Sequence, residues 1–220
     1  MKCLIIAAGK GSRLRSLTEA KPLISLKGIP LIDRVIDSAL KAGVDDFYVV
    51  IGYQGTLIRS HLEAVSRAKN ISITIIENEE WERANGVSVL KAKQYLDEPF
   101  FLLMSDHIFD AEIACQLVLQ SSGNKGILLA VDENLGNPFI DMDDVTRVLA
   151  EKSRIQEIGK GIESYNCFDT GIFLCDPALF SAIEKSSEEA GDDSLSGGVR
   201  ILAQEGKANV MPVNGLFWCD

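Results

Sequence analysis

The sequence predicts one α/β domain built on a mostly parallel sheet with helices on both faces. Short apolar runs, typical of buried parallel strands, alternate with segments whose apolar residues recur at helical spacing. This alternation is that of repeated βαβ units. The 220 residues suit one sizeable domain, and no internal repeat or low-complexity linker divides them. We therefore expect residues 1–220 to form a single domain.

The first half of the chain shows the clearest alternation. The segment Pro30–Ala42 has apolar residues at helical spacing, a proline in its first turn and Gly43 just beyond its end. The strands predicted in this half are Lys2–Ala7, Asp46–Ile51, Ile71–Ile76, Pro99–Met104 and Gly126–Val131. The helices predicted between them are Pro30–Ala42, Gln54–Ala68, Gly86–Tyr95 and Asp110–Leu119.

The second half changes character, and we expect a small antiparallel insertion there. Its strands would be Ile140–Asp141 and Val145–Ala150, which flank the turn-like Met142-Asp143-Asp144, and then Arg154–Ile158. Further along we expect strand Thr170–Cys175, helix Pro177–Lys185, the acidic loop Ser186–Ser196, helix Leu195–Gln204 and strands Ala208–Pro212 and Leu216–Trp218. Because the sequence stops directly after an apolar strand, we expect the natural chain to continue past Asp220.

Composition narrows the classes of function. The net charge is −10, so we expect no nucleic-acid partner, since phosphate backbones need a basic face. The five cysteines are scattered and contain no CxxC, which disfavours a disulfide framework or a structural zinc site and favours a reducing cytoplasm. No apolar run is long enough to span a bilayer, so this segment is not expected to cross a membrane.

Distinctive residues follow the predicted strands at their carboxyl ends, where ligands lie in open α/β sheets. The first strand is followed by Gly9-Lys10-Gly11-Ser12-Arg13, in which backbone N–H groups can approach an anion and Arg13 adds a cationic fork. A glycine-rich turn alone would be weak evidence. Lys21, next to the rigid Pro22, supplies a second cation, so we expect a phosphate-binding site here.

Two other phosphate motifs do not fit this loop. A Walker A loop needs Gly-Lys-Ser/Thr after a longer spacing, and Lys10 comes too early. A dinucleotide fingerprint needs a third glycine where Leu14 stands, and an acid after the second strand where Ile51-Gly52 stand. A nicotinamide-dependent oxidoreductase is therefore disfavoured.

Two aspartates occupy positions suited to a metal ion. Asp106 follows the strand Pro99–Met104, and Asp220 follows Trp218-Cys219. Each alone could be a helix N-cap. Together, in a chain with a phosphate loop, they favour Mg²⁺ bound between protein carboxylates and a triphosphate. The chain has only two histidines, so a histidine-based metal site or catalytic triad is improbable, and we expect His107 to shape its turn.

The segment Ala7-Ala8-Gly9-Lys10-Gly11-Ser12-Arg13-Leu14, followed by Lys21-Pro22-Leu23, resembles the signature of the sugar-1-phosphate nucleotidyltransferases, and the resemblance extends over essentially the whole chain. It implies a Rossmann-like, GT-A-like fold, with Arg13 and Lys21 as catalytic residues. The implied nucleotide-binding residues are Ala8, Gly9, Gly11, Ser12, Asn85 and Gly86. The implied acceptor-binding residues are Lys160, Thr170 and Gly171, and the implied metal ligands are Asp106 and Asp220.

The sequence differs from the pattern of the sugar enzymes in two respects, and both change the substrate that we expect. Many sugar enzymes of the family have a sugar-binding glutamate where Gly159 stands, which disfavours a hexose. The segment Asn85-Gly86-Val87-Ser88 looks more like that of cytidylyltransferases, and Met104-Ser105-Asp106-His107 resembles the inositol-1-phosphate cytidylyltransferases. Those enzymes are often fused to a membrane-embedded phosphotransferase domain, which would tie the protein to the cytoplasmic face of a membrane.

We therefore expect CTP and a phosphorylated alcohol, inositol-1-phosphate, to be joined with release of pyrophosphate, by charge stabilisation and positioning and without a general base. Hexose-1-phosphate or phosphocholine with another nucleoside triphosphate is the alternative. An inactive nucleotide-binding module is the alternative from another class, although Arg13, Lys21, Asp106 and Asp220 together argue against it.

Overall fold

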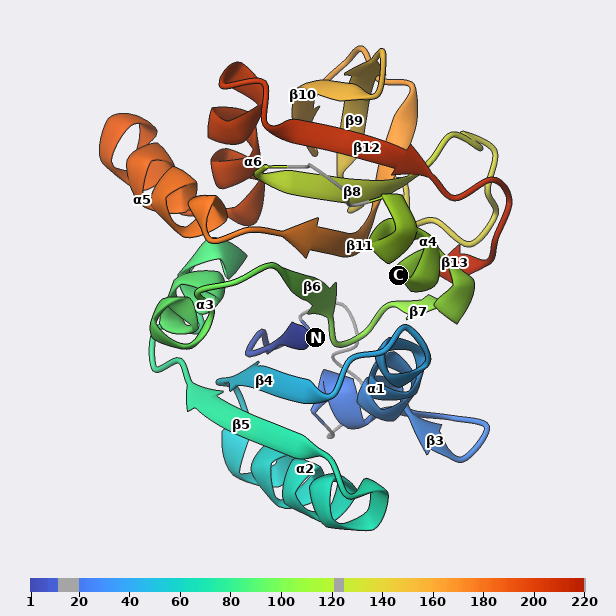
Figure 1. Cartoon of the computed structure of the whole chain (residues 1–220), viewed down its shortest axis with the longest axis vertical. Coiled ribbons are helices and arrows are strands. Elements are labelled where there is room, and N and C mark those ends of the chain that lie inside the picture. The colour runs from blue at the N-terminus through green and yellow to red at the C-terminus, as the bar shows by residue number, and fades with distance from the viewer. Residues whose placement is uncertain (12–19, 121–124, 220) are drawn as a thin grey trace.

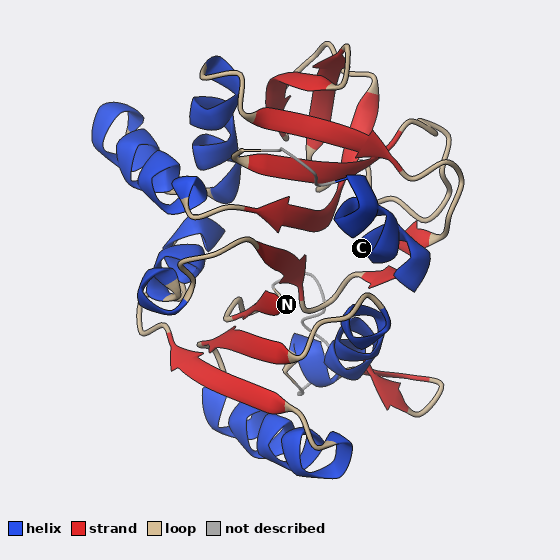
Figure 2. Cartoon of the chain, viewed as in Figure 1, coloured by secondary structure: helices blue, strands red, loops and turns tan. Residues whose placement is uncertain are grey.

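The computed structural model describes residues 1–11, 20–120 and 125–219 (Figure 1). Among them a nine-stranded sheet has the order β5-β4-β1-β6-β11-β8-β12-β10-β9, and helices cover both faces (Figure 2). Its strands are β1 Lys2–Ala7, β4 Asp46–Ile51, β5 Ser72–Glu77, β6 Phe100–Met104, β8 Ile127–Asp132, β9 Arg147–Glu151, β10 Arg154–Gly159, β11 Cys167–Cys175 and β12 Ala208–Pro212. The helices are α1 Leu31–Lys41, α2 Gly55–Lys69, α3 Asn85–Lys91, α4 Ala111–Gln120, α5 Ala178–Ala190 and α6 Leu195–Gln204.

The strands that the first half of the chain contributes to the main sheet are all parallel. Strand β1 pairs in parallel with both β4 and β6, and β4 pairs in parallel with β5. The carboxyl ends of these strands therefore lie at one edge of the sheet. The predicted βαβ alternation of this half is confirmed, and the fold is the expected Rossmann-like arrangement.

Antiparallel pairings in the main sheet all involve β10 or β11. Strand β11 lies between β6 and β8 and is antiparallel to both. Strand β10 is antiparallel to β9 and β12, which forms the small antiparallel insertion that the sequence predicts. Strands β8 and β12 are parallel again. The edge that collects the carboxyl ends of β1, β6 and β8 consequently receives the beginning of β11 as well.

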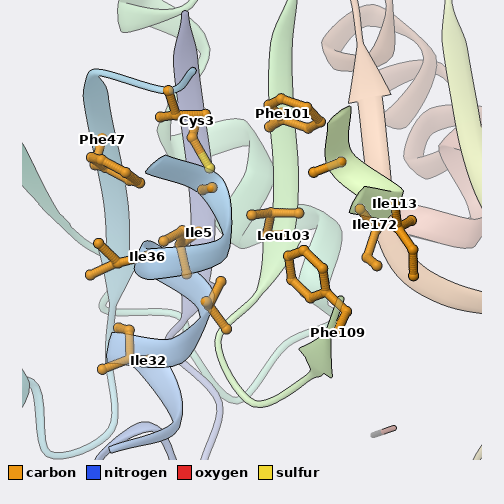
Figure 3. Packing of buried hydrophobic residues seen from close by; sticks show 14 of the residues in the cluster. Cys3, Ile5, Ile32, Ile36, Phe47, Phe101, Leu103, Phe109, Ile113 and Ile172 are labelled. Atoms are coloured by element: carbon orange, nitrogen blue, oxygen red, sulfur yellow. The ribbon is translucent and has the colours of Figure 1, made fainter. Parts of the chain in front are cut away.

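Alternate residues of each central strand enter two separate cores. In β1, Cys3 and Ile5 face a core completed by α1, α2 and α4, whereas Leu4 and Ile6 face a core completed by α3, α5 and α6. Figure 3 shows the first of these, where Phe47, Phe101 and other ring and branched side chains interlock. Both faces of the sheet are buried, which explains why the strands read as continuous apolar runs. None of the described helices has the length and apolarity needed to cross a membrane.

The predicted end of one helix and one predicted strand are wrong. Residues 186–190 belong to α5, because the segment is amphipathic: Ser186 is buried, the glutamates face solvent, and the helix ends at Gly191 in the left-handed conformation. Ile140–Asp141 is not a strand. The Asp141 side chain accepts the Asp143 N–H and its carbonyl accepts the N–H groups of residues 144 and 145, which closes a turn.

Short elements also differ from expectation. The predicted helix Gly86–Tyr95 divides into α3 and the 3₁₀ turn Lys93–Tyr95. The sequence did not indicate the hairpin of β2 (Ser25–Leu26) with β3 (Ile29–Pro30). The predicted strand Leu216–Trp218 overlaps β13 (Trp218–Cys219), but the sequence did not indicate β7 (Ile108–Phe109), which is too short for a periodicity, or the pairing of the two.

The β7–β13 ribbon is fastened to the main sheet through a buried polar contact. The Trp218 indole N–H donates to Asp132 Oδ2 over 2.8 Å, and Trp218 is 1% exposed. The Asn137 side chain donates to the same oxygen at 2.9 Å, and the Asn134 N–H donates to Oδ1. Asp132, at the end of β8, therefore joins the last strand to the sheet and to the following loop.

We expect Trp218→Phe to lower the free energy of unfolding by about 2–3 kcal/mol, because the buried Asp132 carboxyl loses a hydrogen-bond donor. Urea denaturation followed by circular dichroism measures it. Phe217→Leu, a change at a half-exposed neighbour, is the control and should have little effect. Equal stability of the two variants would show that the hydrogen bond from the indole to Asp132 does not stabilise the fold.

Candidate active site

Two cavities meet at the edge formed by the ends of β1 and β6. The first, of about 190 Å³, is lined by Gly9, Gly11, Trp81, Arg83 and Ser88 among others. The second, of about 200 Å³, is lined by His107, Asp144, Thr146, Lys160, Asp169, Gly171 and Ser196 among others. Lys21, Asn85, Met104 and Asp106 line both. The cavities thus form one cleft with these four residues at its junction.

The described part of the glycine loop is shaped around Lys21. Gly11 has φ +62°, and a Cβ added there would lie 2.8 Å from Lys21 Cδ, so any side chain at position 11 would displace the lysine. Gly9 is exposed at the first cavity. Ala8 is buried, and its carbonyl accepts the Tyr53 N–H at 2.9 Å, which fixes the loop to the end of β4. Ser12 and Arg13 lie outside the described residues.

Lys21 and Asp106 form an ion pair at the junction of the cavities. Their side chains are 21% and 20% exposed, so the pair is shielded yet reachable from the cleft. Burial pushes the pKa of Asp106 upward, but the charges of His107 and Lys21 outweigh it and hold that pKa below its ordinary value. Asp106 is therefore a carboxylate at neutral pH.

His107 is fixed by the start of β11. Its Nδ1 lies 2.8 Å from the Thr170 carbonyl oxygen and so carries the hydrogen, and its Nε2 lies 3.9 Å from Asp106 Oδ1. Gly171, at φ +74°, leaves room for the ring, since a Cβ there would lie 2.4 Å from His107 Nδ1. His107 shapes the turn, as expected, and it also lines the second cavity.

Thr170 is one of the residues predicted to bind the acceptor. Its side chain is fully buried, and its hydroxyl donates to the Ala130 carbonyl at 2.8 Å. The side chain therefore faces β8 and does not line the second cavity. Gly171, its neighbour, does line the second cavity.

Asn85 and Gly86 connect the cleft to α6. Asn85 is exposed at the junction, and its Oδ1 accepts the Leu195 N–H at 2.9 Å. Gly86 is buried, and a Cβ there would lie 2.3 Å from the Asp193 carbonyl oxygen. This glycine is therefore covered by the loop that precedes α6, and its role beside the nucleotide base stays a prediction.

Lys160 follows β10 and lines the second cavity, as Lys21 does. Its ammonium pairs with Asp144, and its side chain is 60% exposed. The cation is thus held at the rim by a single described ion pair that an anionic ligand could compete for. Its position in the second cavity separates it from the glycine loop, which lines the first.

The sequence analysis missed Asp169. This carboxyl lines the second cavity, and its Oδ1 accepts the Gly171 N–H at 2.7 Å. Burial raises its pKa to about 6, against the lowering influence of the Gly171 N–H and His107. The sequence does contain an indication of this residue, because an acid is unusual within a mostly apolar run such as Cys167–Cys175.

The donor set at the junction suits a hard divalent cation. Asp106 offers an ionised, partly exposed carboxylate, and Mg²⁺ is commonly held by one or two carboxylates together with substrate phosphates. Within the described ranges, no group of three or more His, Cys, Asp or Glu side chains could by itself hold a metal ion. The second predicted ligand, Asp220, lies outside the described residues.

The raised pKa of Asp169 predicts a stability change. The folded pKa, about 6, exceeds the unfolded value near 3.9, so folding favours the neutral form. Below about pH 4 both states are protonated and no penalty exists; as pH rises through 6 the folded state loses stability. We expect Asp169→Asn, which keeps the acceptor for Gly171, to raise the free energy of unfolding at pH 7.5 by about 1–2 kcal/mol, a figure discounted for partial exposure.

The measurement is urea denaturation of both proteins at pH 4 and pH 7.5, with the exposed Asp143→Asn as the control. The gain should vanish at pH 4 and be absent from the control. An equal gain at both pH values would show that charge burial at Asp169 is not its cause.

Curated relatives match nearly the whole chain. The chain is 32% identical over 219 residues to a "Bifunctional IPC transferase and DIPP synthase" of Aquifex aeolicus, covering 99% of this chain and 48% of that protein. A protein of the same description from Rubrobacter xylanophilus is 33% identical over 98% of this chain and 48% of its own length. The chain therefore spans about half the length of the curated relatives it matches.

Solved structures agree with this relationship. The inositol-1-phosphate CTP transferase from T. maritima superposes with a TM-score of 0.87 at 29% identity, covering 100% of this chain and 88% of that one. A UDP-glucose pyrophosphorylase with a TM-score of 0.78 and 15% identity shares the fold. The family model described as a MobA-like NTP transferase domain matches residues 3–196. The predicted membership of the nucleotidyltransferases is thus confirmed, and the chain belongs to the family of MobA-like NTP transferase domains.

Proposed function

We propose that this domain transfers a cytidylyl group from CTP to inositol-1-phosphate, which gives CDP-inositol and pyrophosphate. The observation that carries the proposal is the divided cleft, with the glycine loop in one cavity, Lys160 in the other, and Lys21 and Asp106 between them. Such a cleft suits a reaction that joins two phosphorylated substrates at the junction.

The chemistry needs little from protein side chains beyond position and charge. A phosphate oxygen of the acceptor attacks the α-phosphorus of CTP, a new P–O bond forms, and the bond to the bridging oxygen breaks as pyrophosphate leaves. No general base is required because a phosphate monoester is largely ionised near neutral pH. Lys21, at the junction, would stabilise the charge that develops on the α-phosphate.

The other residues divide between the two substrates. The N–H groups around Gly9 and Gly11, together with Ser12 and Arg13, would bind the β- and γ-phosphates. Asn85 and Ser88 present polar groups to the first cavity, where the base would lie. Lys160 would bind the acceptor phosphate, exchanging its pairing with Asp144 for the ligand. Lys160 and Lys21, which line the same cavity, would then align the attacking phosphate.

Asp106 and Asp220 would hold Mg²⁺. The ion would neutralise charge on the triphosphate. Support for Asp106 comes from its ionised state and its place at the junction. Support for Asp220 comes from its neighbours, since Cys219 pairs with Ile108, two residues after Asp106.

The choice of CTP and inositol-1-phosphate draws on the relatives. The T. maritima protein is described as an inositol-1-phosphate CTP transferase, and the curated relatives as bifunctional. We further propose that the protein has a second, membrane-embedded phosphotransferase domain, which would consume the CDP-inositol at the cytoplasmic face of the membrane. Cys3, Cys115, Cys167 and Cys175 are free thiols in the structure, which is compatible with a reducing compartment.

A pyrophosphate-release screen tests the proposal. Each of the common ribonucleoside triphosphates is combined with inositol-1-phosphate, glucose-1-phosphate or phosphocholine, with and without Mg²⁺. We expect the largest rate for CTP with inositol-1-phosphate and Mg²⁺, and CDP-inositol as the product by mass spectrometry. Faster turnover of a hexose phosphate would overturn the acceptor. Nucleotide binding without pyrophosphate release would favour a non-catalytic module.

We expect Asp106→Asn to reduce turnover by a factor of ~10² or more while the protein stays folded, because a transition-state charge interaction is lost. Initial rates at saturating substrates measure it, with the melting temperature as the check on folding. Asp97→Asn, at an exposed position that lines neither cavity, is the matched control. Near wild-type turnover in Asp106→Asn would remove Asp106 from the mechanism.

A further inference from the structure

The second cavity contains an acid for which the transfer step has no use. In the proposed reaction Lys160 binds the acceptor phosphate, Lys21 stabilises charge on the α-phosphate, and Asp106 and Asp220 hold the metal. Asp169 lines the same cavity, yet it is an anion in a place that must admit an anionic substrate. A carboxylate there must therefore face a part of the acceptor other than its phosphate.

The backbone of β11 holds Asp169 toward the cavity. The neighbouring side chains Phe168 and Thr170 are fully buried, so Asp169 lies on the opposite face of the strand. The pairing of β11 with β8 shifts register between Asp169 and Phe173, and irregularities of this kind redirect side chains next to active sites. Of the described residues, only Gly171 donates a hydrogen bond to this carboxyl.

Retaining this carboxyl costs stability. It is held among protein atoms that raise its pKa, and no Lys or Arg of the described residues pairs with it. The nearby ammonium groups of Lys21 and Lys160 are paired instead with Asp106 and Asp144. A group that destabilises the free protein and faces a ligand cavity is typical of a functional residue.

The chemistry of the cavity identifies what Asp169 binds. A carboxylate accepts hydrogen bonds and donates none, so its partner must carry O–H or N–H groups. Thr146, Ser196 and Asp144 add further polar groups to the same wall. The described lining contains Phe173 and His107 as its only rings, too few for the aromatic cage that recognises a quaternary ammonium. A polyhydroxylated ring meets these conditions, with its hydroxyls toward Asp169 and its phosphate toward Lys160.

We propose that Asp169 is the residue that selects the acceptor, by accepting hydrogen bonds from ring hydroxyl groups of a phosphorylated cyclic polyol. This inference rests on the proposed function and adds to it the group that recognises the acceptor. Repulsion between this carboxylate and the acceptor phosphate also sets the orientation in which the acceptor enters.

The test compares acceptors with and without ring hydroxyls in wild type and Asp169→Asn. With saturating CTP and Mg²⁺, pyrophosphate release is measured against inositol-1-phosphate and against cyclohexyl phosphate, which has the same ring without the hydroxyls. We expect Asp169→Asn to raise the KM for inositol-1-phosphate ~10- to 100-fold, as for loss of hydrogen bonds to a charged group. The KM for CTP and the rate with cyclohexyl phosphate should change less than about twofold, because neither depends on that carboxylate.

Asp143→Asn, on the exposed turn beside Asp144, is the control and should behave as wild type. Should Asp169→Asn fail to fold, Asp169→Ser replaces it. Equal loss with both acceptors, or a loss in the KM for CTP, would assign Asp169 a structural role and overturn the proposal.

The proposed function and this inference can fail separately. If wild type does not use inositol-1-phosphate, the proposed function fails, and the Asp169 comparison is made with the best hydroxylated acceptor of the screen and its deoxy counterpart. If phosphocholine is the best acceptor, the inference fails as well, because that substrate has no ring hydroxyl.

Discussion

The parallel pairing of β1 between β4 and β6 is the constraint from which the site follows. It brings the ends of strands that are far apart in sequence to one edge, so the loop after Ala7 lies beside the segment after Met104. Ser105 N–H donates to the Ile6 carbonyl at 3.2 Å, and Tyr53 N–H donates to Ala8 at 2.9 Å. These two backbone contacts continue the pairing past the strand ends and fix the floor of the cleft.

Glycines set how closely the surrounding segments approach this floor. The absence of a side chain at Gly11 leaves space for Lys21, and the absence of one at Gly171 leaves space for the His107 ring. A Cβ at Gly52 would lie 2.5 Å from the Trp81 Cβ, and the Trp81 ring lies 5.3 Å from that of Tyr53. At each of these sites a backbone without a side chain permits a functional or aromatic group to pack against the sheet edge. The positions of charged groups in the cleft therefore depend on close backbone packing.

Two aspartates of the cleft differ through their surroundings. Asp106 lies against Lys21 and near His107, and its pKa is lowered. Asp169 has a backbone N–H as its described hydrogen-bond partner, and burial raises its pKa to about 6. The first environment favours a permanent carboxylate suited to a cation. The second favours a carboxylate that gains from hydrogen-bond donors brought by a ligand, which is the physical basis for assigning the two acids different substrates.

The sequence by itself determined the reaction class and most of the fold. Periodicity located the first-half elements because both faces of the sheet are buried, and the residues at strand ends identified the loop, Lys21 and Asp106. It could not indicate that Gly86 lies under the loop before α6, or that Thr170 points to β8, because both depend on contacts between distant segments. Asp169 was missed for the same reason: its role depends on the β11 irregularity and on the antiparallel position of β11 between β6 and β8. Local patterns determine which strands and loops form, whereas the direction of a side chain at a cavity wall is decided only when nonlocal packing is complete.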